Sequence, residues 1–375
     1  MTSRPRRGTI SVALVGIGEL WESRVKPAIQ EFRDRVKIAG VFDEVRTRSV
    51  AVASEFKADC LPSITALSER PDIDGVIICD AGWMKSSIIE LLTMRRKDCL
   101  IFDWERLSEA ELQRIAELAD DIGTTLMVDF EARFQPVLRR LRELSATELG
   151  PARHIEIFLP AISSDREARH QYLAERELIE WLDASQVLFG RTPHALVARR
   201  DSFMLEKTPS AVPQLLSETA NAEKELWWPW WGREGSHLSA MFRPPAPSSK
   251  PARDTGEDAG KTAAPLSLTF RREVVTSYGE LSCDEKRRPE IRARLTFANG
   301  VSQFSSTTEL TWTPQAGVAN CEDLSGERPA HVLMLDQFIR RSIGGLLPVP
   351  ELSQILRFRQ LLRNLSWESQ ELPNH

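Results

Sequence analysis

Residues 12–21 read VALVGIGELW, an apolar run that leads into Gly-x-Gly. In a dinucleotide-binding turn the first glycine makes the bend, the second lets backbone N–H groups approach pyrophosphate, and a third lets the helix pack on the strand. Gly16 and Gly18 fill the first two positions, but Trp21 stands at the third. Asp43, at the end of the next apolar run, is the acid expected to bind the ribose hydroxyls. The predicted cofactor-binding residues are Gly16, Ile17, Gly18, Glu19, Leu20, Asp43, Asp80 and Trp83.

The composition argues against a nucleic-acid-binding, zinc-binding, disulfide-bonded or membrane-spanning protein. The 375 residues carry 49 Lys plus Arg against 54 Asp plus Glu, a formal charge of −5, and the basic residues form no stripe, so nucleic acid is not an expected partner. The 5 cysteines are far apart, which favours neither a zinc site nor disulfides and fits a reducing cytoplasm. No apolar run reaches the roughly 18 residues of a membrane span. We expect a soluble cytoplasmic protein without metal.

The periodicity predicts two domains. Within residues 1–130, short β-branched runs at 10–15, 38–42, 75–79, 99–102 and 125–128 alternate with helical stretches, which is typical of a Rossmann-type, doubly wound parallel sheet. The Ser108 to Glu111 capping box begins a helix that ends near Gly123.

Residues 131–375 show a different pattern. Alternating strands at 154–159, 266–270 and 291–297, the last followed by Asn299-Gly300, predict an α+β domain with a largely antiparallel open sheet. Residues 243–264 are too polar to pack and are expected to be a disordered loop. The chain is predicted to close with helices within 332–365.

Five strings in order resemble the Gfo/Idh/MocA family of glucose-fructose oxidoreductase and inositol dehydrogenase. They are VALVGIGEL, VFDEVRTRSVAVASEF, ERPDIDGVII, GTTLMVDFEARFQP and LDQFIRRSIGGLLPVP. The resemblance implies an NAD- or NADP-dependent oxidoreductase for a sugar, a polyol or a related carbonyl compound. It also implies a homo-oligomer that associates through the sheet of the second domain.

The chain departs from the family at both of its catalytic motifs. The lysine of the family's Glu-Lys-Pro triplet falls on Asp103 within Phe102-Asp103-Trp104. The Asp and His of the second motif fall on Arg176 and Glu180. Hydride transfer at a hydroxyl needs a group that exchanges its proton, so the resemblance leaves the catalytic group unassigned.

Trp21, Trp83 and Trp104 each follow the carboxyl end of a predicted strand, where an open α/β sheet binds its ligand. We therefore expect the three indoles to converge on one cleft. Either they fill the space of a lost cofactor, or they stack on nicotinamide, adenine or a ring-shaped substrate.

Lys85 and Asp103 are the candidate catalytic residues. Lys85 stands where the family commonly has a histidine and, if partly buried, could act as an acid or base. The alternative is a surface lysine or a simple ion pair. Asp103 is a candidate base, and Glu105-Arg106 a candidate contact for a polar substrate.

Three further features of the second domain have two interpretations each. Glu180 and Asp183 are either a carboxylate pair or two exposed acids on a helix. His170 is either a site residue or a surface histidine. The run ELWWPWWGREG at 225–235 fits an oligomer interface or a platform for a carbohydrate.

These observations leave three hypotheses. The first, which we prefer, is a divergent NAD(P)-dependent oxidoreductase with a small-molecule substrate such as a carbohydrate. The second is a binding or scaffold protein that retains the fold without catalysis. The third, implied only by the resemblance, is a lyase or hydrolase that oxidises its substrate transiently.

Overall fold

The computed structural model describes residues 9–160, 167–200, 236–242, 266–273, 292–305, 307–345, 347–364 and 366–367. The chain divides into two compact units, the first with residues 1–134 and 328–358 and the second with residues 135–327 and 359–375. The predicted loop at 243–264 and the tryptophan run at 225–235 lie outside the described residues.

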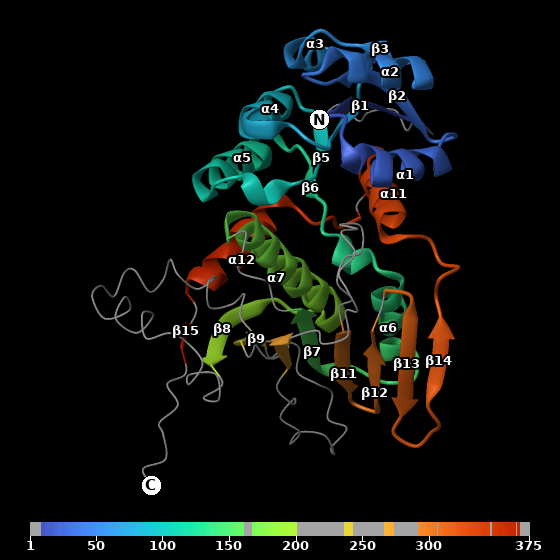
Figure 1. Cartoon of the computed structure of the whole chain (residues 1–375), viewed down its shortest axis with the longest axis vertical. Helices are drawn as coiled ribbons and strands as arrows, with labels where there is room; N and C mark the ends of the chain where they lie inside the picture. The colour runs from blue at the N-terminus through green and yellow to red at the C-terminus, as the bar shows by residue number, and fades with distance from the viewer. Residues whose placement is uncertain are drawn as a thin grey trace, which may run out of the picture. The chain divides into compact units, whose positions relative to one another are not determined.

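The first unit contains a six-stranded parallel sheet in the order β3-β2-β1-β4-β5-β6 (Figure 1). The strands are β1 (Ile10–Val15), β2 (Val36–Phe42), β3 (Asp59–Cys60), β4 (Gly75–Ile78), β5 (Asp98–Ile101) and β6 (Leu126–Val128). The central strands are apolar on both faces because helices cover both sides of such a sheet. The five predicted strands are confirmed, and β3 is an addition.

The helices of this unit follow the strands. They are η1 (Trp21–Val25), α1 (Lys26–Glu31), α2 (Arg46–Phe56), α3 (Ile64–Ser68), η2 (Gly82–Met84), α4 (Lys85–Met94), η3 (Trp104–Arg106), α5 (Glu109–Ile122), η4 (Glu131–Phe134) and α11 (Ala330–Ser342). The predicted capping box of Ser108 and Glu111 begins α5, and Gly123 ends it in the left-handed conformation.

Helix α11 belongs to the first unit, although the sequence places it within the predicted second domain at 131–375. It packs against α1, and its fully buried Phe338 lies beside Gly75 of β4, where even a Cβ atom would be crowded. The first unit therefore buries one face of its sheet with a helix from the far end of the chain.

The second unit contains a mixed, mostly antiparallel sheet of nine strands in the order β14-β13-β12-β11-β7-β10-β9-β8-β15. Its elements are α6 (Pro136–Thr147), β7 (Ala152–Pro160), α7 (Glu167–Phe189), β8 (Pro193–Arg200), β9 (Ser236–Phe242), β10 (Ser267–Glu273), β11 (Arg292–Phe297), β12 (Gly300–Phe304), β13 (Glu309–Pro314), β14 (Asn320–Asp323), α12 (Leu352–Arg363), which runs across the boundary of the units, and β15 (Ser366–Trp367). Asn299-Gly300 forms the predicted hairpin between β11 and β12. The predicted fold class is confirmed in both units.

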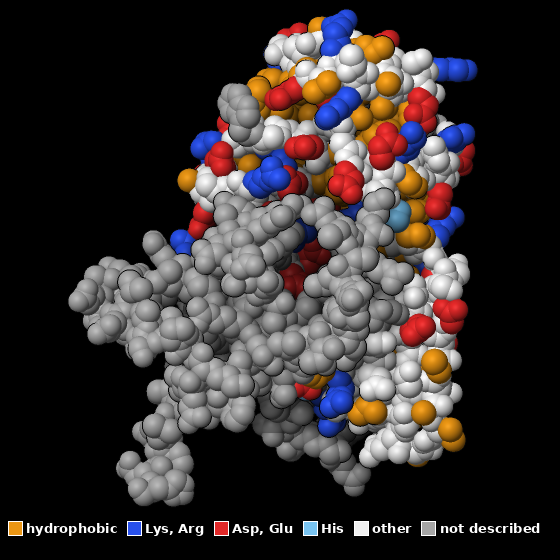
Figure 2. Space-filling view, viewed as in Figure 1, with side chains coloured by type: hydrophobic (Ala, Val, Ile, Leu, Met, Phe, Trp, Pro, Cys, Tyr) orange, Lys and Arg blue, Asp and Glu red, His pale blue; other side chains and the backbone are white. Residues whose placement is uncertain are grey.

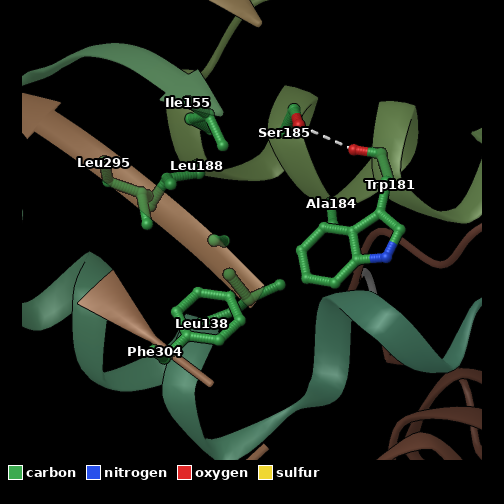
Figure 3. Close-up of a pocket in the computed structure, with 9 residues that line it drawn as sticks. Leu138, Ile155, Trp181, Ala184, Ser185, Leu188, Leu295 and Phe304 are labelled. Carbon is green, nitrogen blue, oxygen red and sulfur yellow. Dashed lines mark hydrogen bonds between the residues drawn. The ribbon is translucent and has the colours of Figure 1, made fainter. Parts of the chain in front are cut away.

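The core of the second unit lies between the sheet and helices α6 and α7. Trp181 of α7 lies beside Leu138 of α6 and Phe304 of β12, and its ring stacks on that of Phe304 at a centroid distance of 6.2 Å (Figure 3). The seam between these apolar side chains has no room for a water molecule. It is packing and offers no space to a ligand.

Candidate functional site

The turn after β1 has the backbone geometry of a nucleotide-binding bend. Gly16 has a φ angle of +80°, and a Cβ atom there would overlap the carbonyl group of Asp80, so only glycine fits. At Gly18, by contrast, a Cβ atom would meet nothing within 4 Å. The second glycine therefore faces open space, which is the requirement for close approach of a diphosphate.

Asp43 holds this turn from the end of β2. Its Oδ2 accepts the N–H of Ile17 at 2.5 Å and its Oδ1 accepts the N–H of Val45 at 2.7 Å. Arg48 of α2 lies on the other side of the loop, with Nη1 at 3.4 Å from the Ile17 carbonyl. The carboxylate fixes the bend. Because a carboxylate oxygen can accept more than one hydrogen bond, Asp43 can still accept hydrogen bonds from ribose hydroxyls.

The other predicted cofactor residues are Glu19 and Leu20, which follow Gly18, and Asp80 and Trp83, which follow β4. Glu19 is exposed and Leu20 is half-buried, with part of its side chain on the core. Asp80 is exposed, and its Oδ1 accepts the N–H of Gly82 at 3.1 Å. Trp83 lies in η2, and its side chain is outside the described atoms.

Trp21 is part of the hydrophobic core and does not lie over the bend. Its side chain is fully buried among core residues that include Val25 and Ile29, and its ring meets that of Phe56 edge-on at 5.6 Å. The chain forms a π-helix over Trp21–Val25, a wider turn than an α-helix. A wider turn suits an indole at a position where a glycine would let helix and strand approach closely.

Trp104 is also fully buried, but it packs on a different residue, Phe130 after β6, at a centroid distance of 5.5 Å. Neither Trp21 nor Trp104 exposes a ring face. Because both rings are buried, the interpretation that they stack on a ligand is wrong for these two, while the interpretation that they fill the space of a lost cofactor stays a hypothesis.

Lys85 and Asp103, the two predicted catalytic residues, do meet. Strands β4 and β5 are parallel neighbours, so the residues that follow them lie at the same edge of the sheet. Lys85 begins α4 with only 2% of its side chain exposed, and its Nζ donates to Asp103 Oδ2 at 3.1 Å. The interpretation of Lys85 as a surface lysine is wrong, while that of an ion pair is confirmed.

The sequence analysis did not single out Asp129, a buried carboxylate at the same edge. It follows β6 directly and is 1% exposed. The signal in the sequence that could have indicated this site is an acidic residue directly after an apolar run.

Burial raises the pKa of the nearby Cys79 thiol, and the charges of Asp80 and Asp129 add to the effect while Lys85 opposes it. Cys79 therefore stays protonated.

Helix α7 holds the charged residues predicted in the second unit. Arg176 and Glu180 form a largely buried ion pair at 2.7 Å, and Asp183 is fully buried. Two exposed acids are therefore excluded, and Glu180 pairs with Arg176. The side chain of His170 lies outside the described atoms. Among the described residues, no cluster of His, Cys, Asp and Glu could hold a metal ion.

Residues 10–130, which include the whole turn, match the profile described as an oxidoreductase family with an NAD-binding Rossmann fold, Gfo/Idh/MocA. This part of the chain is similar to the Gfo/Idh/MocA oxidoreductases. The chain is 24% identical over 180 residues to UDP-N-acetylglucosamine 3-dehydrogenase of Acidithiobacillus ferrooxidans, an alignment with 48% of this chain and 54% of that protein. It thus spans about half the length of this relative.

Solved structures share the fold along almost the whole chain. The same Acidithiobacillus ferrooxidans enzyme superposes with a TM-score of 0.61 at 18% identity, with 95% of this chain and 98% of that one covered. An oxidoreductase domain protein from Kribbella flavida gives a TM-score of 0.64 at 15% identity, covering 95% and 96%. A putative myo-inositol dehydrogenase from Sinorhizobium meliloti gives 0.60 at 16%, covering 94% and 95%. The chain therefore has the two-domain architecture of the Gfo/Idh/MocA proteins.

The described surface of the first unit carries side chains of both charges. Lys and Arg side chains are interspersed with Asp and Glu side chains on the face of the first unit shown in Figure 2. None of the described helices has the length and hydropathy to cross a membrane.

Proposed function

We propose that this chain is an NAD(P)-dependent oxidoreductase that acts on a sugar, a polyol or a related carbonyl compound. The observation that carries the proposal is the turn after β1, where Gly16 makes the bend, Gly18 faces open space and Asp43 holds the loop. The turn lies within the residues that match the NAD-binding family. The substrate class is supported by the relative named as a dehydrogenase of UDP-N-acetylglucosamine.

The residues of the turn fit a dinucleotide. The open face at Gly18 leaves room for a diphosphate beside the backbone N–H groups of Gly18, Glu19 and Leu20, at the start of a helix. Asp43 is the proposed ribose ligand and favours NAD, while the neighbouring Arg46 and Arg48 would favour the 2′-phosphate of NADP. Asp80 and Trp83 are the proposed contacts at the end of β4. When bound, the dinucleotide supplies the hydride acceptor or donor.

Lys85 and Asp103 are the proposed residues of the catalytic site. Both follow strands at the carboxyl edge of the sheet, where open α/β sheets bind their ligands. We also propose a cytoplasmic location and a homo-oligomer that associates through the sheet of the second unit.

A scaffold protein without catalysis is the second candidate. The observation that favours it is the replacement of the family's Glu-Lys-Pro triplet by Phe102-Asp103-Trp104. Trp104 is buried, and its indole N–H has no hydrogen-bond partner among the residues that the structure describes. A scaffold would bind neither dinucleotide.

Titration of the purified protein with NADH and NADPH tests the proposal. Binding is followed by quenching of tryptophan emission and by energy transfer to the reduced nicotinamide. We expect the wild-type protein to bind one of the two in the micromolar range. Gly18→Val places a branched side chain in the open space and should weaken binding at least ~10-fold, or about 1.4 kcal/mol.

Gly326→Val is the matched control, because a Cβ atom at Gly326 also meets nothing within 4 Å but lies in the other unit. It should leave the affinity unchanged. Absence of binding of both dinucleotides to the wild-type protein would refute the oxidoreductase and favour the scaffold. Unchanged affinity in Gly18→Val would place the cofactor elsewhere.

A further inference from the structure

Lys85 is a buried ammonium group that has used all of its donors. Its Nζ donates to the carbonyl oxygens of Phe102 at 3.1 Å and Asp103 at 2.9 Å, as well as to Asp103 Oδ2 at 3.1 Å. An ammonium group has three N–H bonds, so this set is complete. A lysine held in this way has no free donor for a substrate and is poorly placed to exchange a proton.

Asp103 is the exposed member of the pair. Its side chain is 28% exposed, and its Oδ2 accepts from Lys85 and forms an ion pair with the Arg106 Nε at 3.0 Å. Among the described residues, Oδ1 has no hydrogen-bond donor. One carboxylate oxygen is thus anchored by two cations, and the other is left for a partner in solution.

The backbone at Asp103 supports a functional role. Asp103 has a φ angle of +56°, a left-handed conformation that residues other than glycine seldom adopt. Lys85 stabilises this conformation through the two carbonyl groups that flank it. Strained residues held by surrounding structure concentrate at functional sites, and this one follows β5 at the ligand-binding edge of the sheet.

We propose that Asp103 exchanges the proton of the substrate hydroxyl and that Lys85 is a positioning residue. This rests on the proposed oxidoreductase function. In the oxidation, the substrate O–H bond breaks as its proton passes to the Asp103 carboxylate, an O–H bond forms on Oδ1, and a carbonyl group forms on the substrate. The substrate C–H bond breaks, and an oxidised dinucleotide held at the turn by Gly18 and Asp43 would supply the acceptor for the hydride, which carries the electron pair. In the reduction the protonated Asp103 returns the proton.

The test compares kcat, KM and dinucleotide affinity in Asp103→Asn, Lys85→Met and Lys85→Arg. The probes are NAD⁺ and NADP⁺ with UDP-N-acetylglucosamine or myo-inositol, the compounds in the names of the similar proteins. Asp103→Asn should lower kcat at least ~100-fold, leave the dinucleotide affinity unchanged, and remove the acidic limb of the pH profile of kcat. Lys85→Met should lower kcat less and keep that limb, and Lys85→Arg should restore part of the loss.

Two variants are matched controls. Lys97 is also buried, and its Nζ donates to the carbonyl groups of Arg70 and Ile73, but it precedes β5 at the opposite edge of the sheet. Asp120 is an exposed acid on α5. Lys97→Met and Asp120→Asn should therefore keep the wild-type kcat.

The outcomes separate the two proposals. A wild-type protein that binds no dinucleotide refutes the proposed function. A wild-type protein that binds and turns over, with kcat of Asp103→Asn within about twofold of it, refutes the role of Asp103 alone. Binding without turnover of either probe also counts against that role. If Lys85→Met does not fold, Lys85→Arg and Asp103→Asn still decide.

Discussion

Replacement of Trp21 by glycine restores three glycines to the turn and distinguishes a core residue from a cofactor substitute. Because the indole is fully buried, its removal should cost about 3–5 kcal/mol in the free energy of unfolding. Glycine within a helix adds about 1 kcal/mol. Since a whole domain is stable by only about 5–15 kcal/mol, Trp21→Gly should leave the first unit marginally folded, without tighter dinucleotide binding.

Trp21→Phe should be far milder. The phenyl ring keeps an apolar neighbour for Phe56, and the variant removes a buried indole N–H that has no acceptor in the described part of the chain. A buried donor without a partner costs about 1–3 kcal/mol, so its removal offsets part of the lost packing. We expect a net cost below about 2 kcal/mol.

Hydrogen exchange of the β1 and β2 amides during a urea titration measures these costs, because it reports on the first unit alone. NADH titration of the same variants gives the affinity. Tighter NADH binding by Trp21→Gly at little cost in stability would show that the indole competes with the cofactor. The assignment of Trp21 to the core would then be wrong.

Three further predictions follow from single residues. Gly16→Ala should destabilise the first unit by at least about 1–2 kcal/mol, the cost of the left-handed backbone alone; urea unfolding equal to wild type would contradict the clash with the Asp80 carbonyl. Burial lowers the pKa of His331 below its usual 6.5, so stability is full above that pH and decreases as the pH falls towards the folded-state pKa; His331→Gln should flatten urea midpoints measured from about pH 5 to 8, and an unchanged slope would refute this. Iodoacetamide labelling read by mass spectrometry should modify the exposed Cys321 before the buried Cys79 and Cys99, whose thiol pKa values are raised by burial; labelling of all three at one rate would argue against the burial.

The sequence predicts the first unit well because apolar runs and glycine bends are local signals. It does not predict β3, because the two residues Asp59–Cys60 are too short to show a period. It also leaves open whether Trp21 packs in the core or stacks on a ligand, since the direction of the ring depends on the phase of a helix whose first turn is widened. The proximity of Lys85 and Asp103 is predictable from neighbouring strand ends, but the burial of Lys85 is not. That burial depends on where the carbonyl groups of Phe102 and Asp103 point.

The position of α11 has a consequence for folding during synthesis. Ala330–Ser342 leaves the ribosome roughly 200 residues after the last strand of the sheet that it covers. Until then one face of the parallel sheet lacks the helix that covers it. The residues between the two segments of the first unit form the second unit. Truncation before Ala330 would therefore expose a face of the sheet in the amino-terminal unit.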